Sequence, residues 1–367
     1  MHVVIIGAGV MGCATAWRLA QAGVRVTVLE RALPGAEASS AAAGILGAQT
    51  ENDAPGPLLD LCLASRALWP RFADELQAAS GMAVNLLQHG LLEVCTSPAE
   101  VAVRQQRAQW MQAQGLRAQW LDAQTAREME PALGPAILGA LLLPDDGQVE
   151  PPLLAQALAV AATRAGAQIL SGRTVQRVAT MAERVTGVQT DKEHLDADAV
   201  VIAAGAWTDL VPGLAPRRTP IQPLHGQLLL LHAGERKFHA TLAGRHSGGR
   251  HGYVVPRADG RVVVGATSEA IGYDKRVTAG GMQWLLSLAL EFVPALTDAR
   301  VLDHWSGLRP QSHDGLPLLG PHRDVAGLVF ASGHHRNGIL LTPVTADVTV
   351  NAVLGLRQRL NLAAFRP

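Results

Sequence analysis

Residues 3–30 read VVIIGAGVMGCATAWRLAQAGVRVTVLE, and this stretch decides the fold. Residues 3–6 form an unbroken apolar run, as a strand that is buried on both faces requires. A helical pattern of apolar residues follows and stops at Gly23, a residue type that commonly ends helices. Residues 24–28 then alternate like a second strand, which closes with Glu30. The stretch therefore predicts a strand–helix–strand unit.

The glycines at the first strand–helix turn, Gly7, Gly9 and Gly12, have the spacing G-x-G-x-x-G. In a dinucleotide-binding unit such glycines allow a tight turn, close approach of the backbone to a pyrophosphate, and close packing of the helix on the strand. The phosphates lie at the amino end of the helix, and Glu30 stands where a carboxylate binds the ribose diol. A glycine-rich turn without a ligand is the alternative. Dinucleotide binding is favoured because the strands, the helix and the acid are in register.

The composition is that of a globular protein with a large core. The chain has 367 residues, 48% of them hydrophobic, which allows two domains or one discontinuous pair. Lys and Arg together number 31, as do Asp and Glu, so we expect no nucleic acid and no membrane as a partner. Cys13, Cys62 and Cys95 show no metal-type spacing and suit a reducing compartment. No apolar run approaches the roughly 20 residues of a bilayer span, so we expect a cytoplasmic protein.

The remaining chain predicts a strand-rich unit inserted into the nucleotide-binding one. Residues 198–205, DAVVIAAG, read as another buried strand, and residues 220–267 read as strands with a hairpin turn at 258–260. Residues 84–96 predict a further hairpin that turns at His89-Gly90. The last helix is expected to be capped by Thr342, with Pro343 in its first position.

The expected fold class is therefore α/β (α+β overall), because strands and helices alternate at both ends of the chain around a strand-rich middle. We expect a doubly wound, Rossmann-like nucleotide-binding domain with an antiparallel-sheet substrate domain inserted in it. The predicted boundaries are 1–82, 145–218 and 301–367 for the nucleotide-binding domain, and 83–144 and 219–300 for the substrate domain.

Segment 31–49, RALPGAEASSAAAGILGAQ, follows the ribose acid and is rich in small residues. Its backbone could approach a flat or anionic group, although a flexible linker is the alternative. The chain has no G-x-S-x-G elbow, no H-E-x-x-H and no Walker loop. His334 and His335 are adjacent and would point to opposite faces of a strand, so we expect no metal site. The chemistry should therefore belong mostly to a cofactor.

Arg309 and Arg336 interrupt apolar, glycine-rich segments that hold little other charge. Two arginines at one pocket suggest a carboxylate substrate, which a guanidinium grips with a planar fork. Tyr253 could add a phenolic donor to the same carboxylate. The alternatives are structural ion pairs for the arginines and a core position for the tyrosine.

Six segments carry a family resemblance that spans nearly the whole chain: VVIIGAGVMG, ASSAAAGILGA, VVIAAGAW, HGYVVPRADGRVVVGATSE, WSGLRPQSHDGLPLLG and ASGHHRNGILLTP. The chain resembles the FAD-dependent amine and amino-acid oxidases of the D-amino acid oxidase superfamily, and most closely the glycine oxidases of thiazole (thiamine) biosynthesis. The resemblance implies FAD as the cofactor. It also implies a noncovalent flavin, because covalent relatives attach it through a late cysteine and no cysteine follows Cys95.

The resemblance also assigns roles to individual residues. Arg309 would make the main contact with the substrate carboxylate, with Tyr253 and Arg336 closing around it. The AMP half of FAD would lie at Val10, Met11, Glu30, Arg31 and Val175. The flavin and pyrophosphate would lie along Ala38, Ser39, Ala43, Gly44 and Ile45, and the ring along His334, His335, Arg336, Asn337, Gly338, Ile339 and Leu340.

Two of these positions need comment. Arg31 could be read as a clamp for the phosphate of NADP, but the neighbouring Glu30 carboxylate would repel that phosphate. His335 stands where the family pattern has an aromatic residue such as Phe or Tyr, which leaves the shape of the pocket near Arg336 open.

The implied reaction oxidises the C–N bond of glycine, and also of sarcosine and small D-amino acids. It gives the oxo acid, ammonia and, with dioxygen as acceptor, hydrogen peroxide. We further expect a homo-oligomer whose imine product is handed to thiazole synthase. A D-amino acid dehydrogenase, a sarcosine or other secondary-amine oxidase, and a flavin module without turnover are the alternatives.

Overall fold

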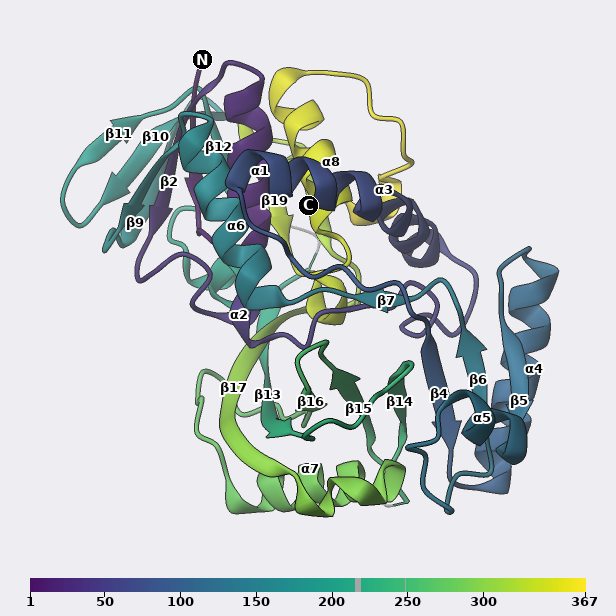
Figure 1. Ribbon diagram of the computed structural model, residues 1–367. Coiled ribbons are helices and arrows are strands. Elements are labelled where there is room, and N and C mark those ends of the chain that lie inside the picture. Colours follow the sequence, from purple (N-terminus) through teal and green to yellow (C-terminus); the bar gives the residue numbers. More distant parts are fainter. Residues whose placement is uncertain (215–218, 248) are drawn as a thin grey trace.

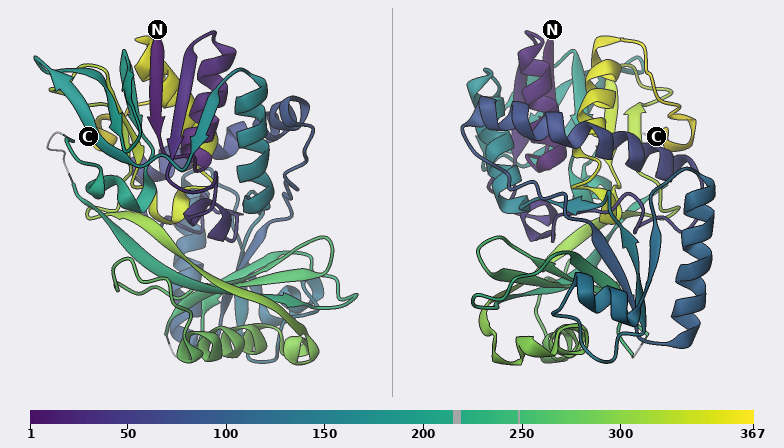
Figure 2. Two further views of the ribbon diagram at one scale, coloured as in Figure 1. Left: turned by 90° about the vertical axis from the view of Figure 1, so that its left-hand side faces the viewer. Right: turned by 45° about the vertical axis from the view of Figure 1, so that its right-hand side comes forward.

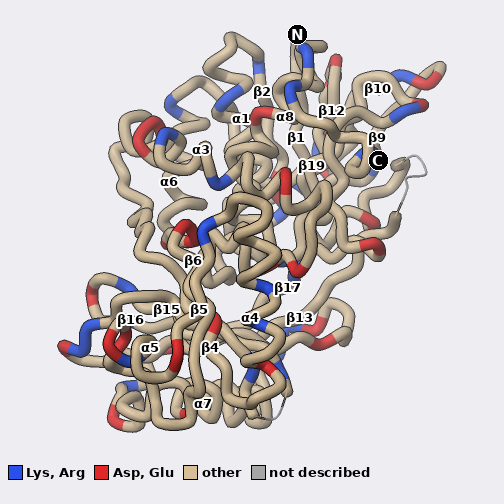
Figure 3. The backbone as a smooth tube through the Cα atoms, turned by 90° about the vertical axis from the view of Figure 1, so that its right-hand side faces the viewer, with Lys and Arg blue, Asp and Glu red and all other residues tan. Residues whose placement is uncertain are grey.

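The computed structural model describes residues 1–214, 219–247 and 249–367. Figures 1 and 2 show two lobes, between which the chain passes several times. One lobe contains a six-stranded sheet and both chain termini, and the other contains an eight-stranded sheet. Lys and Arg are interspersed with Asp and Glu over both lobes (Figure 3). Within the described ranges, no helix is long and apolar enough to cross a membrane.

The six-stranded sheet has the order β18-β19-β12-β1-β2-β8. Its centre is β1 (His2–Ile6), which is buried along its whole length and pairs in parallel with its two neighbours. The chain order of the parallel strands reverses between β1 and β12, as it does in dinucleotide-binding folds. The other strands are β2 (Arg25–Glu30), β8 (Gln168–Ser171), β12 (Ala199–Ile202), β19 (Leu328–Ser332) and the antiparallel edge strand β18 (Leu318–Pro321).

The two faces of this sheet are covered differently. Val3 and Ile5 of β1 belong to the core that the sheet forms with the helices α1 (Val10–Gln21), α3 (Pro57–Ser80), α6 (Pro151–Arg164) and α8 (Thr342–Leu354). Val4 and Ile6 pack against a three-stranded sheet of β9 (Val175–Met181), β10 (Arg184–Thr190) and β11 (His194–Asp196). The α/β class is confirmed, and a small sheet takes the place of helices on the second face.

The eight-stranded sheet has the order β17-β13-β16-β15-β14-β4-β6-β5. Its strands are β4 (Leu91–Cys95), β5 (Gln119–Asp122), β6 (Gly139–Leu143), β13 (Ile221–His232), β14 (Thr241–Arg245), β15 (His251–Pro256), β16 (Arg261–Gly265) and β17 (Arg300–Ser312). Helix α7 (Ala279–Phe292) packs on β13, β15 and β16, and α4 (Pro98–Ala113) and α5 (Ala123–Met129) pack on the other end of the sheet. The long strands β13 and β17 reach back to the first lobe (Figure 2).

The predicted hairpin with a turn at 258–260 is confirmed, because β15 and β16 pair in antiparallel register. The hairpin predicted over residues 84–96 is wrong. Leu87 bridges to Gln148, whereas β4 pairs with β6 and, in parallel, with β14. Every residue of β4 is buried, so both of its faces pack inside the lobe and its side chains do not alternate between core and solvent.

Shorter elements connect these layers. They are α2 (Ala38–Ala41), β3 (Ile45–Leu46), β7 (Gly147–Gln148) and the 3-10 turns η1 (Gly205–Leu210), η2 (Pro294–Asp298), η3 (His335–Asn337) and η4 (Ala363–Phe365). The cap predicted for α8 is wrong, because Thr342 is already helical and its hydroxyl donates to the Gly338 carbonyl (3.0 Å). Pro343 does lie in the first turn of α8, as predicted.

The division into two domains at the predicted boundaries stays a proposal. Strand pairing favours one change to it: β17 pairs with β13 from Ser312 opposite Ile221 to Arg300 opposite His232, and so belongs with the eight-stranded sheet. The boundary predicted at residues 218–219 falls at segment 215–218, which lies outside the described residues.

Candidate functional site

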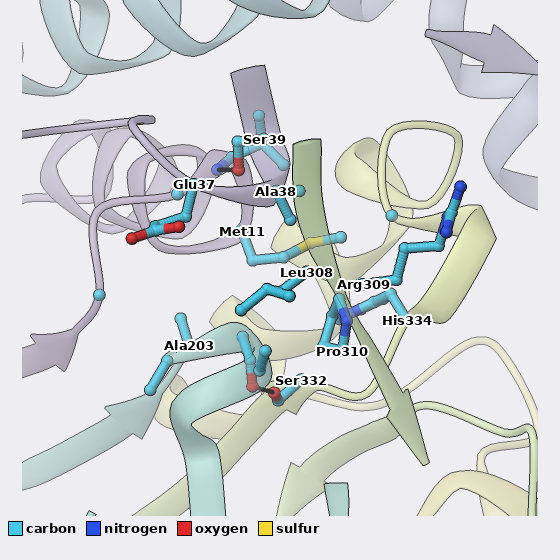
Figure 4. Close-up of a pocket in the computed structure, with 18 of the residues that line it drawn as sticks. Met11, Glu37, Ala38, Ser39, Ala203, Leu308, Arg309, Pro310, Ser332 and His334 are labelled. Atoms are coloured by element: carbon cyan, nitrogen blue, oxygen red, sulfur yellow. Dashed lines mark hydrogen bonds between the residues drawn. The ribbon is translucent and has the colours of Figure 1, made fainter. Parts of the chain in front are cut away.

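One pocket is lined by residues at the carboxyl ends of β1, β2 and β12 and by residues of β13, β15 and β17 of the eight-stranded sheet. It therefore starts where the strand order of the first sheet reverses, the position at which ligands bind in open α/β sheets. In Figure 4, Leu308 and Pro310 of β17 reach the same cavity as Met11 of α1 and Ala203, which follows β12. Both lobes thus contribute to one site.

The glycine-rich turn lines this pocket on the side of the first lobe. Gly7 has a positive φ of 104°, and a Cβ at this position would overlap the Ala203 carbonyl oxygen. A Cβ at Gly12 would overlap the Gly7 carbonyl oxygen, so this glycine allows α1 to pack on β1. A Cβ at Gly9 would lie only 2.9 Å from the Ser39 Oγ. Gly7 and Gly12 therefore have the steric roles that the sequence predicts, whereas the approach of a pyrophosphate at Gly9 stays a prediction.

The amino end of α1 can receive an anion. Its N-cap, Gly9, provides no side-chain cap, and the first turn of this helix contains no acidic residue. The Val10 N–H donates to Ser39 Oγ (3.0 Å), which ties the loop after β2 to the helix. The positive end of the helix dipole and its free N–H groups favour phosphate at this point.

Glu30 is fixed at the end of β2 by two backbone N–H groups. Ala8 donates to its Oε2 and Ala32 to its Oε1, each at 2.9 Å. The carboxylate lines the pocket beside Arg31 and Val175. This arrangement orients an acceptor toward the pocket, as binding of a ribose diol requires.

Most residues predicted for the cofactor line this pocket. They are Gly7, Gly9, Val10, Met11, Glu30, Arg31, Ala38, Ser39, Ala43, Gly44, Ile45, Val175, His334, His335, Arg336, Gly338 and Ile339. Gly12, Asn337 and Leu340 do not line it. The Leu340 carbonyl instead accepts hydrogen bonds from Ser65 Oγ (2.6 Å) and Trp69 Nε1 (2.9 Å), which anchor this segment to α3.

The other end of the pocket contains Arg309 and Tyr253. Arg309 Nη1 donates to the Thr267 carbonyl (3.2 Å), and Gly226 on the neighbouring strand leaves room for the guanidinium. Tyr253 is 9% exposed. Burial raises the pKa of its phenol, although Arg309 and Arg336 act in the opposite direction, so the phenol is neutral and available as a donor.

Arg336 lines the pocket and already has a carboxylate partner, because its Nε lies 3.3 Å from Glu51 Oε2. The ion pair that was the structural alternative for this residue is therefore present. Glu51 belongs to a loop that α4 holds: Arg107 Nη2 donates to the carbonyls of Gln49 (2.6 Å) and Asn52 (3.0 Å).

Two adjacent histidines, His335 in η3 and its N-cap residue His334, are both neutral. Burial lowers the pKa of His334 to about 3, and its Nε2 lies 3.0 Å from Thr345 Oγ1. Burial, followed by the charges of Arg336 and Arg309, lowers the pKa of His335 to about 4. His335 has a positive φ of 48°, and among the described residues no hydrogen-bond partner of its buried Nε2 is found.

Other pocket residues were not predicted from the sequence, and they include Glu37, Glu51, Thr174, Trp207, Gly226, Leu308 and Ser332. Trp207 is the last residue of the segment VVIAAGAW, which contributed to the family resemblance without a role for this residue. Glu51 gave no signal, because its partner Arg336 is far away in the sequence. Over the described parts of the chain, no group of three or more His, Cys, Asp or Glu side chains could hold a metal ion.

This geometry defines a dinucleotide-binding protein with a second, arginine-containing compartment in the same pocket. A family model described as "FAD dependent oxidoreductase" matches residues 2–352. The chain belongs to this family, and its dinucleotide is FAD. The residues fit the cofactor, since the crowded glycine turn, the uncapped amino end of α1 and the oriented Glu30 carboxylate are those that an adenine dinucleotide requires.

Within this family, the chain is similar to glycine oxidases. The chain is 38% identical to a glycine oxidase of Geobacillus kaustophilus (strain HTA426) over 99% of its own length and 95% of that protein. It superposes on the crystal structure of glycine oxidase from Geobacillus kaustophilus with a TM-score of 0.95, covering 99% of this chain and 97% of that one. It is also 38% identical to a bifunctional protein ThiO/ThiG of Synechocystis sp. over 100% of this chain and 53% of that protein.

Proposed function

We propose that this protein is an FAD-dependent glycine oxidase, which converts glycine, water and dioxygen into the oxo acid, ammonia and hydrogen peroxide. The observation that carries the proposal is the placement of Arg309 and Tyr253 in the same pocket as the glycine-rich turn, at its opposite end. Similarity to glycine oxidases over nearly the full length supports the same activity.

Arg309 would bind the substrate carboxylate. Its guanidinium is partly buried and has one N–H donated to the Thr267 carbonyl, which fixes its plane. Its remaining donors can grip a carboxylate through two parallel hydrogen bonds, which sets both the position and the orientation of a small amino acid. Tyr253 would add a neutral O–H donor from β15.

The same surroundings favour the neutral amine of the substrate. Arg309 and Arg336 are cationic, and His335 beside them is neutral because burial and both arginines lower its pKa. Positive charges near an amine disfavour its protonated form. The lone pair on nitrogen is then free as the C–H bond is broken.

When bound, FAD supplies the hydride acceptor and the reaction with dioxygen. The protein contributes position, since holding the α-carbon at the acceptor converts the step into an intramolecular one and removes the need for a strong base. Apolar lining residues such as Leu228 and Leu308 limit the water that reaches this end of the pocket. The amino end of α8 follows the lining residue Ile339 and adds positive potential.

We also propose that the product serves thiazole synthesis. Support comes from the similarity to the bifunctional protein ThiO/ThiG, of which this chain spans 53%. A homo-oligomer and a cytoplasmic location stay predictions, and light scattering on the purified protein would test the former.

A substrate panel read by peroxide release tests the activity. We expect the purified holoenzyme to release peroxide with glycine and, to different extents, with sarcosine and D-alanine. No peroxide with any of the three, together with reduction of an added quinone analogue by D-alanine, would instead identify a D-amino acid dehydrogenase. If none of the amines reduced the flavin and no acceptor were reduced, the protein would instead be a flavin-binding module without turnover.

A further inference from the structure

Five side chains are joined by four contacts at the nucleotide end of the pocket, and the backbone of residues 273–275 closes them into a ring that we call the clasp. Its members are Arg31, Glu37, Trp207, Tyr273 and Lys275. The first three line the pocket, whereas the last two do not. Tyr273 and Lys275 belong to segment 266–278, which connects β16 of the eight-stranded sheet with α7.

The aromatic half of the clasp is a stack. The Arg31 guanidinium carbon lies 3.9 Å from the centre of the Trp207 ring. The Trp207 and Tyr273 rings are tilted by 35° with centroids 5.7 Å apart. The Tyr273 hydroxyl also donates to the Ala206 carbonyl (3.0 Å), so the ring is held at both its face and its tip.

The ionic half of the clasp is centred on Glu37. Its Oε1 accepts from Arg31 Nη2 and its Oε2 from Lys275 Nζ, each at 2.9 Å. Ser306 Oγ of β17 donates to the Lys275 carbonyl (2.6 Å), which ties the segment to the edge of the eight-stranded sheet. One carboxylate therefore connects the end of β2 with the second lobe.

Each of these contacts is weak alone, because Arg31 and Lys275 are 42% and 44% exposed and exposed ion pairs contribute little. Together they connect segment 266–278 with Trp207 and Glu37. Those two residues, together with Arg31, lie along the wall of the pocket next to the ribose acid Glu30.

We propose that the clasp retains the bound dinucleotide. Tyr273 and Lys275 act as positioning residues: they hold Trp207, Arg31 and Glu37 against the nucleotide end and slow the departure of FAD, although neither lines the pocket. Within the described residues, the hydrogen bond, ring contact and ion pair of these two side chains go to Ala206, Trp207 and Glu37, and not to Arg309 or Tyr253. The proposal depends on FAD as the cofactor and not on glycine as the substrate.

The release rate of FAD from the holoenzyme tests the proposal. Flavin fluorescence after dilution would be followed for the wild type and for Tyr273→Ala, Lys275→Met and Arg276→Met. Arg276 is the matched control, because it is the adjacent cation, 71% exposed, and its ion pair is with Asp274 and not with the clasp. This measurement needs no substrate, so its outcome is independent of the proposed activity.

We expect roughly 5- to 10-fold faster release from Tyr273→Ala, the range of a lost aromatic pair and of the cation–π contact that it orders. Lys275→Met should release FAD about 2- to 4-fold faster at low salt, and this difference from the wild type should shrink in high salt. Arg276→Met should match the wild type. The kcat for glycine of this control, measured with FAD in excess, should also equal that of the wild type.

Two results would overturn the clasp. One is wild-type release from both Tyr273→Ala and Lys275→Met. The other is equal acceleration by the control Arg276→Met, which would mean that any change in this segment loosens the lobe. If Tyr273→Ala yields too little folded protein, Lys275→Met and Glu37→Gln, singly and combined, decide the question, because a shared ion pair requires that their effects on release be non-additive.

Discussion

Replacing Gly226 with alanine tests whether Arg309 must occupy its observed position. Gly226 lies on β13 opposite β17, and it has ordinary backbone angles, so only sterics oppose the substitution. The new Cβ would lie 2.6 Å from Arg309 Nη2 and 2.7 Å from its Cζ. It would overlap Arg309 Nη1 more closely still, and ordinary contact begins near 3.4 Å, so the guanidinium must move by about 1 Å.

A displacement of that size should have a large kinetic effect. Misplacing a positioning group by about 1 Å can cost on the order of 100-fold, so we expect kcat/KM for glycine to fall roughly 30- to 100-fold. FAD affinity should be unchanged, because the amino end of α1 and Glu30 lie at the other end of the pocket. Initial rates of peroxide formation and the absorbance of the bound flavin give the two readouts.

The matched control is Gly280→Ala in α7, where a Cβ would meet nothing within 4 Å. It should retain wild-type kinetics. A second control combines Gly226→Ala with Arg309→Lys: if the alanine acts through the guanidinium, its effect in the double variant is much smaller than in the wild type. Wild-type kcat/KM in Gly226→Ala, or a full additional loss in the double variant, would refute this account of Arg309.

Three further predictions concern single groups. Arg309→Lys keeps the positive charge but loses the planar pair of donors that binds a carboxylate. The loss of one charge-assisted hydrogen bond of about 1.5–3 kcal/mol should lower kcat/KM roughly 10- to 150-fold. The control Arg300→Lys, at an exposed position of the same strand, should leave kcat/KM unchanged. Glu51→Gln frees Arg336 from its ion pair and should lower KM for glycine about 2- to 5-fold, whereas a raised KM would mean that Glu51 holds Arg336 in place. Burial lowers the pKa of His334 to about 3, so as the pH falls the unfolded state binds this proton before the folded state does. The neutral, buried His334 therefore contributes its full stability only above pH 6.5. At pH 5 the free energy of unfolding should be about 2 kcal/mol lower for this reason. Thermal unfolding of wild type and His334→Asn between pH 7 and pH 5 would show a shallower loss in the variant, and parallel curves would contradict the assignment.

The nucleotide-binding half of the protein could be predicted from the sequence because its signals are local. The glycine turn, the buried strand before it and Glu30 all lie within residues 3–30, so their spacing can be recognised in one short stretch. The sheet on the second face could not be predicted in this way. Val4 and Ile6 are as apolar as Val3 and Ile5, and the sequence of β1 does not say whether helices or strands cover them.

The substrate end and the clasp depend on contacts between distant parts of the chain. Arg309 stood out because it interrupts an apolar, glycine-rich segment, and Tyr253 because the sequence has only two tyrosines. Three contacts could not be predicted, because the partners in each lie far apart in the sequence: the Glu51–Arg336 pair, the stack of Arg31 on Trp207 and the Lys275–Glu37 pair. The hairpin over residues 84–96 was wrong for a related reason, because β4 finds its parallel partner in β14.

The central claim is that glycine, held by Arg309, gives up its electrons to FAD in this pocket. Anaerobic mixing of the purified holoenzyme with glycine tests it most directly, with the absorbance of the bound flavin near 450 nm as an approximate monitor and the oxo acid measured afterwards. The account predicts complete bleaching, about one oxo acid per flavin, and much slower bleaching in Arg309→Lys. A flavin that stays oxidised with glycine, or that bleaches equally fast in the variant, would contradict it.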